Sequence, residues 1–103
     1  MPRTARIFIE NASYHINVRG IQKNRTFVAE DDFKIYINLL HRYKIKTGCL
    51  LYAYCLMPNH VHLIIESPQG LKAMSSFMHG LNQVYAMIFN NKYDRVGHLW
   101  QNR

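Results

Sequence analysis

Acidic residues are scarce in this sequence. Only 6 of its 103 residues are Asp or Glu, against 13 Lys and Arg, so the formal net charge is +7. Three of the six acids are consecutive, at residues 30–32, and most of the remaining surface is therefore basic. Such an excess is typical of proteins that bind polyanions, and it predicts a nucleic acid as the partner. The alternative is charge that serves only solubility.

Long apolar runs and cysteine pairs are also missing. The longest apolar run, residues 49–57, is far too short to span a bilayer. The N-terminus lacks the apolar stretch of a signal peptide. Cys49 and Cys55 belong to one predicted strand, where they are too far apart to form a disulfide. We therefore expect a cytoplasmic protein with free thiols and no membrane partner.

The hydrophobic pattern predicts one α+β domain over residues 1–103. "SYHINVR" alternates between apolar and polar residues, which indicates a half-buried strand, and "LLYAYCLM" and "HVHLIIE" read as two strands joined by the Pro58-Asn59 turn. Helices are expected over residues 30–47 and 71–91, and "DRVGHLWQNR" is expected to supply a closing strand. This βαββαβ order is the ferredoxin-like split βαβ arrangement, with an antiparallel sheet and two helices on one face.

Two histidines interrupt the third predicted strand. Alternate residues of a strand share a face, so His60 and His62 point the same way. Two such imidazoles form a two-point metal site that leaves positions open for water or substrate. Oxygen ligands would suit Mg²⁺ or Mn²⁺, whereas a third His would favour zinc. The alternatives are core histidines bonded to backbone and plain surface histidines.

Tyr85 lies on the apolar face of the second predicted helix. If that face packs on the side of the sheet that bears His60 and His62, the phenol oxygen can approach the metal. A phenol beside a metal-polarised phosphate is a nucleophile for phosphoryl transfer. The commoner role of such a tyrosine is in the core, with its hydroxyl hydrogen-bonded.

A longer pattern joins these residues. "MPNHVHLII" followed by "FMHGLNQVYAMIFNNKYDRVGHLWQNR" closely resembles the REP-associated tyrosine transposases, which belong to the single-tyrosine HUH transposases. The resemblance also includes "YHINVRG" and covers nearly the whole chain. It implies that His60 and His62 bind a divalent cation, Mg²⁺ or Mn²⁺, and that Tyr85 is the nucleophile. The implied function is a DNA transposase that nicks and rejoins single-stranded hairpin DNA through a 5′-phosphotyrosine intermediate.

The third metal ligand departs from the family pattern. Insertion-sequence relatives have a glutamine one helical turn after the tyrosine, where this chain has Phe89, which cannot coordinate a metal. Asn82, Asn90, Gln101 or water are the candidates to replace it, and each of the three amides has an alternative role as a helix cap or a surface group.

The C-terminal end is a second departure. Family members usually continue beyond "GHLWQNR", so we expect a catalytic domain that is shortened at its C-terminus. The face formed by Val61, Leu63 and Ile65 would then need cover from a further segment or from the second subunit of a homodimer. A shortened chain also supports the alternative of a catalytically inactive DNA-binding module of the same fold. A zinc-dependent hydrolase that reuses the H-x-H motif is a third alternative.

Basic and aromatic side chains are the candidates for contact with DNA. Trp100 and Tyr14 could stack on unpaired bases or belong to the core. The candidates for contact with phosphates, which solvated surface charge would equally explain, are Arg3, Arg6, Arg19, Lys23, Arg25 and Arg95.

Overall fold

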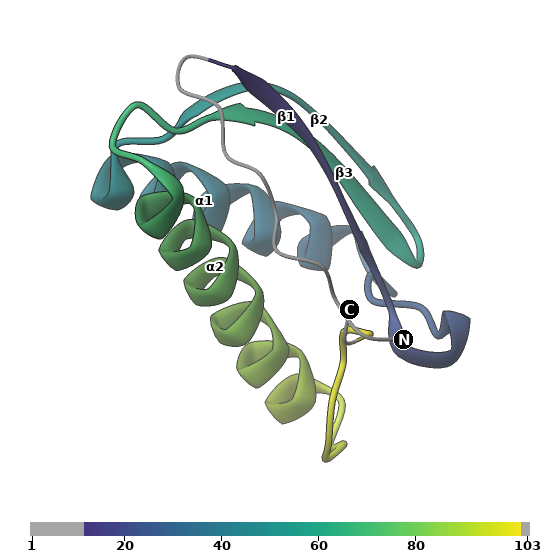
Figure 1. Cartoon of the computed structure of the whole chain (residues 1–103). Helices are drawn as coiled ribbons and strands as arrows, with labels where there is room; N and C mark the ends of the chain where they lie inside the picture. Colours follow the sequence, from purple (N-terminus) through teal and green to yellow (C-terminus); the bar gives the residue numbers. More distant parts are fainter. Residues whose placement is uncertain (1–11, 102–103) are drawn as a thin grey trace, which may run out of the picture.

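A three-stranded antiparallel sheet and two helices make up the computed structural model, which describes residues 12–101 (Figure 1). Both helices lie on the same side of the sheet, as expected for the α+β class (Figure 1). Neither helix has the combination of length and apolar character that is needed to cross a membrane. The elements in chain order are β1 (Ser13–Arg19), the short 3₁₀ helix η1 (Ile21–Lys23), α1 (Glu30–Thr47), β2 (Leu50–Met57), β3 (His60–Glu66) and α2 (Leu71–Lys92).

The sheet has the order β1-β3-β2, so β3 is its central strand. β3 pairs with β1 from Arg19 opposite His60 to Ser13 opposite Glu66. It pairs with β2 from Met57 opposite His60 onward, and the two strands are joined by the short turn at Pro58-Asn59. Both partners are antiparallel to β3, which is the order that the split βαβ arrangement requires.

The hydrophobic core lies between the sheet and the helices. β3 contributes Val61, Leu63 and Ile65, which are fully buried and face the helices. The prediction that this face needs cover from further chain or from a second subunit is therefore wrong, because α1 and α2 bury it. The homodimer loses this support and stays a prediction. The other core residues are Phe27, Tyr36, Leu39, Leu40, Cys49, Met74, Phe77, Leu81, Tyr85, Phe89 and Leu99.

The two helices approach closely because of a glycine. A Cβ built on Gly80 of α2 would lie only 2.5 Å from the ring of Tyr43 on α1. A larger residue at this position would collide with the Tyr43 ring, which would have to move. Farther along, α1 ends at Gly48, whose φ of 76° is left-handed and suits glycine.

Asp32 joins the start of α1 to the end of α2. Its carboxylate Oδ2 accepts hydrogen bonds from the backbone N–H groups of Val28 and Ala29, each at 2.9 Å. Lys92 Nζ donates to Oδ1 at 2.8 Å, and the Tyr93 hydroxyl donates to Oδ2 at 2.6 Å. The acid thus caps one helix and anchors the other.

The closing strand differs from the prediction. Residues 94–101 make one isolated bridge, between Gly20 and Trp100, in place of a strand. The backbone cannot stay extended here because Asp94 and Gly97 have positive φ values of 51° and 93°. The segment nevertheless runs along the outer edge of β1, where the Gln101 N–H donates to the Arg19 carbonyl at 2.8 Å. A fourth strand would occupy the same place.

Candidate metal and DNA-binding site

The two histidines of β3 lie on the face of the sheet that points away from the helices. Val61 between them is buried on the helix side, and strand alternation therefore puts His60 and His62 on the opposite face, where both are half-buried. No described helix or strand covers this open face (Figure 1). Arg19 is the cross-strand neighbour of His60 on β1. Cys55 of β2 is the neighbour of His62.

Both imidazoles are held by hydrogen bonds at Nδ1. His60 Nδ1 lies 2.8 Å from Asn59 Oδ1, and His62 Nδ1 lies 3.0 Å from Nε2 of His15 on β1. The two rings are 4.9 Å apart, centroid to centroid, and nearly perpendicular. In each ring Nε2 is the nitrogen that remains for a ligand.

The surroundings of His62 disfavour the protonated form of its ring. Loss of hydration lowers the pKa of His62, and the neighbouring His60, His15 and Arg19 lower it further. A neutral imidazole has a lone pair, and only that form binds a metal ion.

The donor set fits a divalent cation held at two protein positions. Among residues 12–101 there is no group of three or more His, Cys, Asp and Glu that could hold a metal ion. His15 does not act as a third ligand here, because its Nε2 is directed at His62 Nδ1. Two imidazoles would therefore leave the remaining coordination positions to water or to oxygen atoms of a substrate.

Tyr85 lies on the other side of the sheet. Its side chain is 1% exposed and packs among aromatic residues of the core, and its hydroxyl donates to the Thr26 carbonyl oxygen at 2.5 Å. Burial raises the pKa of Tyr85 far above its usual value. The condition for a phenol at the metal was that this face of α2 packs against the face of His60 and His62, and it is not met, because α2 packs on the apolar face of β3. The structure therefore does not bring the phenol to the histidines.

The three amides considered as third ligands lie away from the histidine pair. Asn82 and Asn90 belong to α2, where Asn82 Oδ1 accepts from the Tyr36 hydroxyl at 2.8 Å and Asn90 Oδ1 accepts from the Arg95 guanidinium at 2.7 Å. Gln101 lies at the outer edge of β1, so that β1 separates it from β3. A metal ion held by the two histidines would need a third ligand from elsewhere, such as water or a substrate oxygen.

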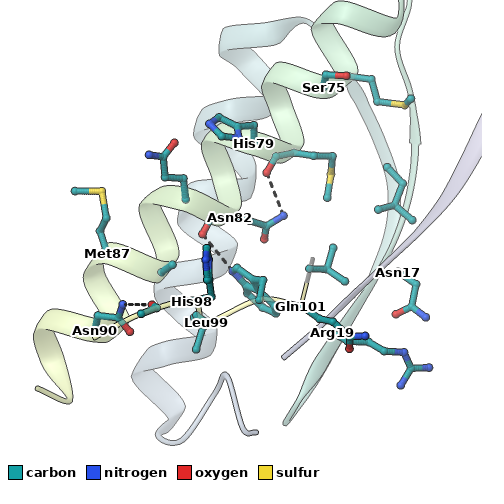
Figure 2. Close-up of a pocket in the computed structure, with 18 of the residues that line it drawn as sticks. Asn17, Arg19, Ser75, His79, Asn82, Met87, Asn90, His98, Leu99 and Gln101 are labelled. Carbon is teal, nitrogen blue, oxygen red and sulfur yellow. Dashed lines mark hydrogen bonds between the residues drawn. The ribbon is translucent and has the colours of Figure 1, made fainter. Parts of the chain in front are cut away.

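The same amides line a groove of about 1580 Å³ between β1, α2 and residues 97–101. Figure 2 shows Asn82, Asn90 and His98 on its walls, with Asn17 and Arg19 of β1 pointing away from α2. His60 and His62 are not among its lining residues. The groove and the open face are therefore different surfaces that meet at β1.

The predicted phosphate contacts separate into two groups. Arg19 is on the open face beside His60. Lys23 at the end of η1 and Arg25 in the following loop are exposed, and the Lys23 carbonyl accepts from Asn59 Nδ2 at 3.4 Å. Arg95 is at the far end of α2 and donates to Asn90 Oδ1 and to the His98 carbonyl. It thus has a structural role away from the histidines. Arg3 and Arg6 lie outside the described residues.

The aromatic candidates belong to the helix side of the sheet. Trp100 packs against Phe27, Tyr36 and Tyr85, and its Nε1–H donates to the Asn82 carbonyl. Tyr14 opposes the buried Ile65 and is partly buried against the core. Both are partly buried and pack against the core.

Two residues beside the histidines were missed at the sequence level. Asn59 stands directly before His60 in the M-P-N-H motif and was interpreted only as a turn residue. His15 is on the polar face of the alternating "SYHINVR" strand, which was a usable signal. The register that puts His15 against His62 could not be known without the pairing of β1 with β3.

Comparison with known proteins agrees with this fold. The model of the family described as IS200-like transposases matches residues 8–103. A solved structure of a candidate transposase from Deinococcus radiodurans R1 has a TM-score of 0.64 and 20% identity, covering 90% of this chain and 70% of that one. No curated protein matches the chain. The structural similarity supports the fold, while the family model extends over nearly the whole sequence, and the chain therefore belongs to the IS200-like transposase family.

Proposed function

We propose that this chain is a transposase that acts on single-stranded or hairpin DNA at a divalent-metal site formed by His60 and His62. The observation that carries the proposal is the pair of adjacent imidazoles on the open sheet face, each held at Nδ1 and each with Nε2 left for a ligand. A bound Mg²⁺ or Mn²⁺ would polarise an oxygen of a DNA phosphate.

The basic residues near the histidines support DNA as the substrate. Arg19 neighbours His60 across the strand pair, and Lys23 and Arg25 extend the positive charge along the following loop. If a DNA strand crossed this end of the open face, its phosphates would lie near these positive side chains, next to His60 and His62. The net charge of +7 acts in the same direction.

The identity of the nucleophile is a separate part of the proposal. The resemblance names Tyr85 as the residue that forms the 5′-phosphotyrosine intermediate. In the described conformation its hydroxyl is buried, hydrogen-bonded to Thr26 and on the opposite side of the sheet from the histidines. Reaction at Tyr85 would therefore require α2 to leave the core first.

This burial favours a second candidate function, a DNA-binding module that holds DNA and a metal without forming a covalent link. The two candidates differ in one product. A transposase produces cleaved DNA and a protein–DNA adduct, whereas the binding module only retards the migration of intact DNA.

A double variant tests the leading proposal. The double variant, His60→Ala with His62→Ala, removes both proposed metal ligands from a partly solvated face, so the fold should survive. We expect Mn²⁺-dependent cleavage of a single-stranded hairpin DNA to disappear, with an unchanged circular dichroism spectrum. The matched control is His79→Ala, which removes an exposed imidazole on α2 away from the site. Cleavage that persists in the double variant would refute the metal role.

A further inference from the structure

His15 contacts His62 from the neighbouring strand. The register of β1 and β3 places Asn17 directly opposite His62 and His15 one step along the same face. His15 Nε2 lies 3.0 Å from His62 Nδ1, and the two ring centroids are 5.1 Å apart. The two rings are tilted by 34°, and the short contact joins one nitrogen to the other at hydrogen-bond distance.

Only one proton can lie in this contact when both rings are neutral. If His62 Nδ1–H donates to His15 Nε2, then His62 Nε2 has its lone pair free for a metal. If His15 donates instead, His62 must carry its proton on Nε2 and cannot bind a metal there. A metal on His62 Nε2 therefore requires His15 to be the acceptor.

Asn59 makes the equivalent contact with His60, and its amide determines which of the two groups donates the hydrogen bond. Asn59 Nδ2 donates to the Lys23 carbonyl at 3.4 Å, which turns Oδ1 toward His60 Nδ1 at 2.8 Å. An amide oxygen only accepts hydrogen bonds, so His60 must carry its proton on Nδ1. Its Nε2 is then the nitrogen with the lone pair.

We propose that His15 and Asn59 are positioning residues that accept hydrogen bonds from Nδ1–H of His62 and His60 and so direct both Nε2 lone pairs to one divalent cation. The inference rests on the proposed metal role of His60 and His62. Groups that accept from the second nitrogen of a ligating histidine orient the ring and raise its basicity. In this chain the two acceptors come from outside β3, one from β1 and one from the turn before β3.

The first test reads the tautomers without metal or DNA. Long-range ¹H–¹⁵N spectra of the metal-free protein, at a pH where both rings are neutral, should show His60 and His62 protonated at Nδ1. His15→Leu should convert His62 to a mixture that includes the Nε2–H form, while His60 keeps its signal. Wild-type protein with His62 protonated at Nε2 would overturn the inference.

The second test measures the affinity for Mn²⁺ from the electron paramagnetic resonance signal of the free ion. His15→Leu and Asn59→Ala should each weaken binding by about 10- to 100-fold. His15→Gln should retain most of the affinity, because its amide oxygen can still accept. The matched control is His79→Leu, which should bind Mn²⁺ as wild type does. Wild-type affinity in both His15→Leu and Asn59→Ala would refute the positioning role.

Failure of the metal site itself would look different. If wild-type protein bound no Mn²⁺, or if the double variant at His60 and His62 bound it unchanged, the proposed metal function would be refuted. The tautomer spectra would still decide whether His15 and Asn59 orient the two rings.

Discussion

Replacing Asp32 with Asn removes one negative charge from the junction of the two helices. Asp32 is almost fully buried, and its carboxylate accepts from two backbone N–H groups, from Lys92 and from Tyr93. Burial alone would raise the pKa of Asp32. The hydrogen bonds from Ala29, Lys92, Tyr93 and Val28 outweigh it and lower the pKa from 3.8 to about 2.

The size of this shift gives the expected loss of stability. One pKa unit corresponds to about 1.4 kcal/mol, so the ionised carboxylate contributes about 2 kcal/mol to the free energy of unfolding at neutral pH. Because the folded-state pKa is the lower one, the contribution is complete above the unfolded-state pKa near 3.8. It is lost as the pH falls from there to about 2.

Urea unfolding of wild type and Asp32→Asn at pH 7, 4 and 2 measures this directly. We expect a difference of about 2 kcal/mol at pH 7 that shrinks to a few tenths of a kcal/mol at pH 2. The control is Asp31→Asn, an exposed neighbour in the same helical turn, which should cost at most about 0.5–1 kcal/mol through the helix dipole. A wild-type-to-Asn difference that stays constant across this pH range would refute the electrostatic reasoning.

Two further predictions concern the tyrosine and the DNA. Tyr85→Phe leaves the Thr26 carbonyl without its hydrogen-bond donor, so the free energy of unfolding should fall by about 1–2 kcal/mol while DNA binding is kept. Loss of a covalent DNA adduct at unchanged stability would instead identify Tyr85 as a nucleophile that reacts from a rearranged state. If Arg19, Lys23 and Arg25 each contact a phosphate, affinity for single-stranded DNA in a gel-shift assay should fall about 20-fold between 50 and 200 mM salt. The triple Gln variant should bind more weakly and lose most of that slope, and an equal slope would count against these contacts.

The regular elements were predictable because their signals are local. The alternation in "SYHINVR" and the apolar "HVHLIIE" correspond to β1 and β3, and the three acids and Gly48 mark the two ends of α1. The closing strand was not predictable in the same way. Its sequence contains aromatic and aliphatic residues, but Asp94 and Gly97 adopt left-handed backbone conformations.

The relation between the histidines and Tyr85 required knowledge of which face the helices cover. The sequence contains the relevant alternation, since Val61, Leu63 and Ile65 are the apolar side of β3 and bury themselves against the helices. From the sequence the side stays open, and packing on the histidine side is only the condition that would bring a phenol to a metal. Burial of apolar side chains decides the packing instead.

Long-range contacts were beyond any local pattern. The three acids at residues 30–32 lie in the first turn of α1, where the helix dipole favours negative charge. The bonds from Lys92 and Tyr93 to Asp32 join residues about sixty positions apart, so neither helix alone reveals them. The contact between His15 and His62 is of the same kind.

The central position of β3 has a consequence for the rigidity of the site. Of the three described strands, β3 is the one paired with another strand on each side, so the backbone at His60 and His62 can move only if the ladders to β1 and β2 both open. Amide hydrogens of β3 should therefore exchange with solvent far more slowly than those on the outer edges of β1 and β2. The backbone that carries the two imidazoles is therefore ordered before a ligand binds. Binding of a ligand between the imidazoles then costs little conformational entropy of the backbone.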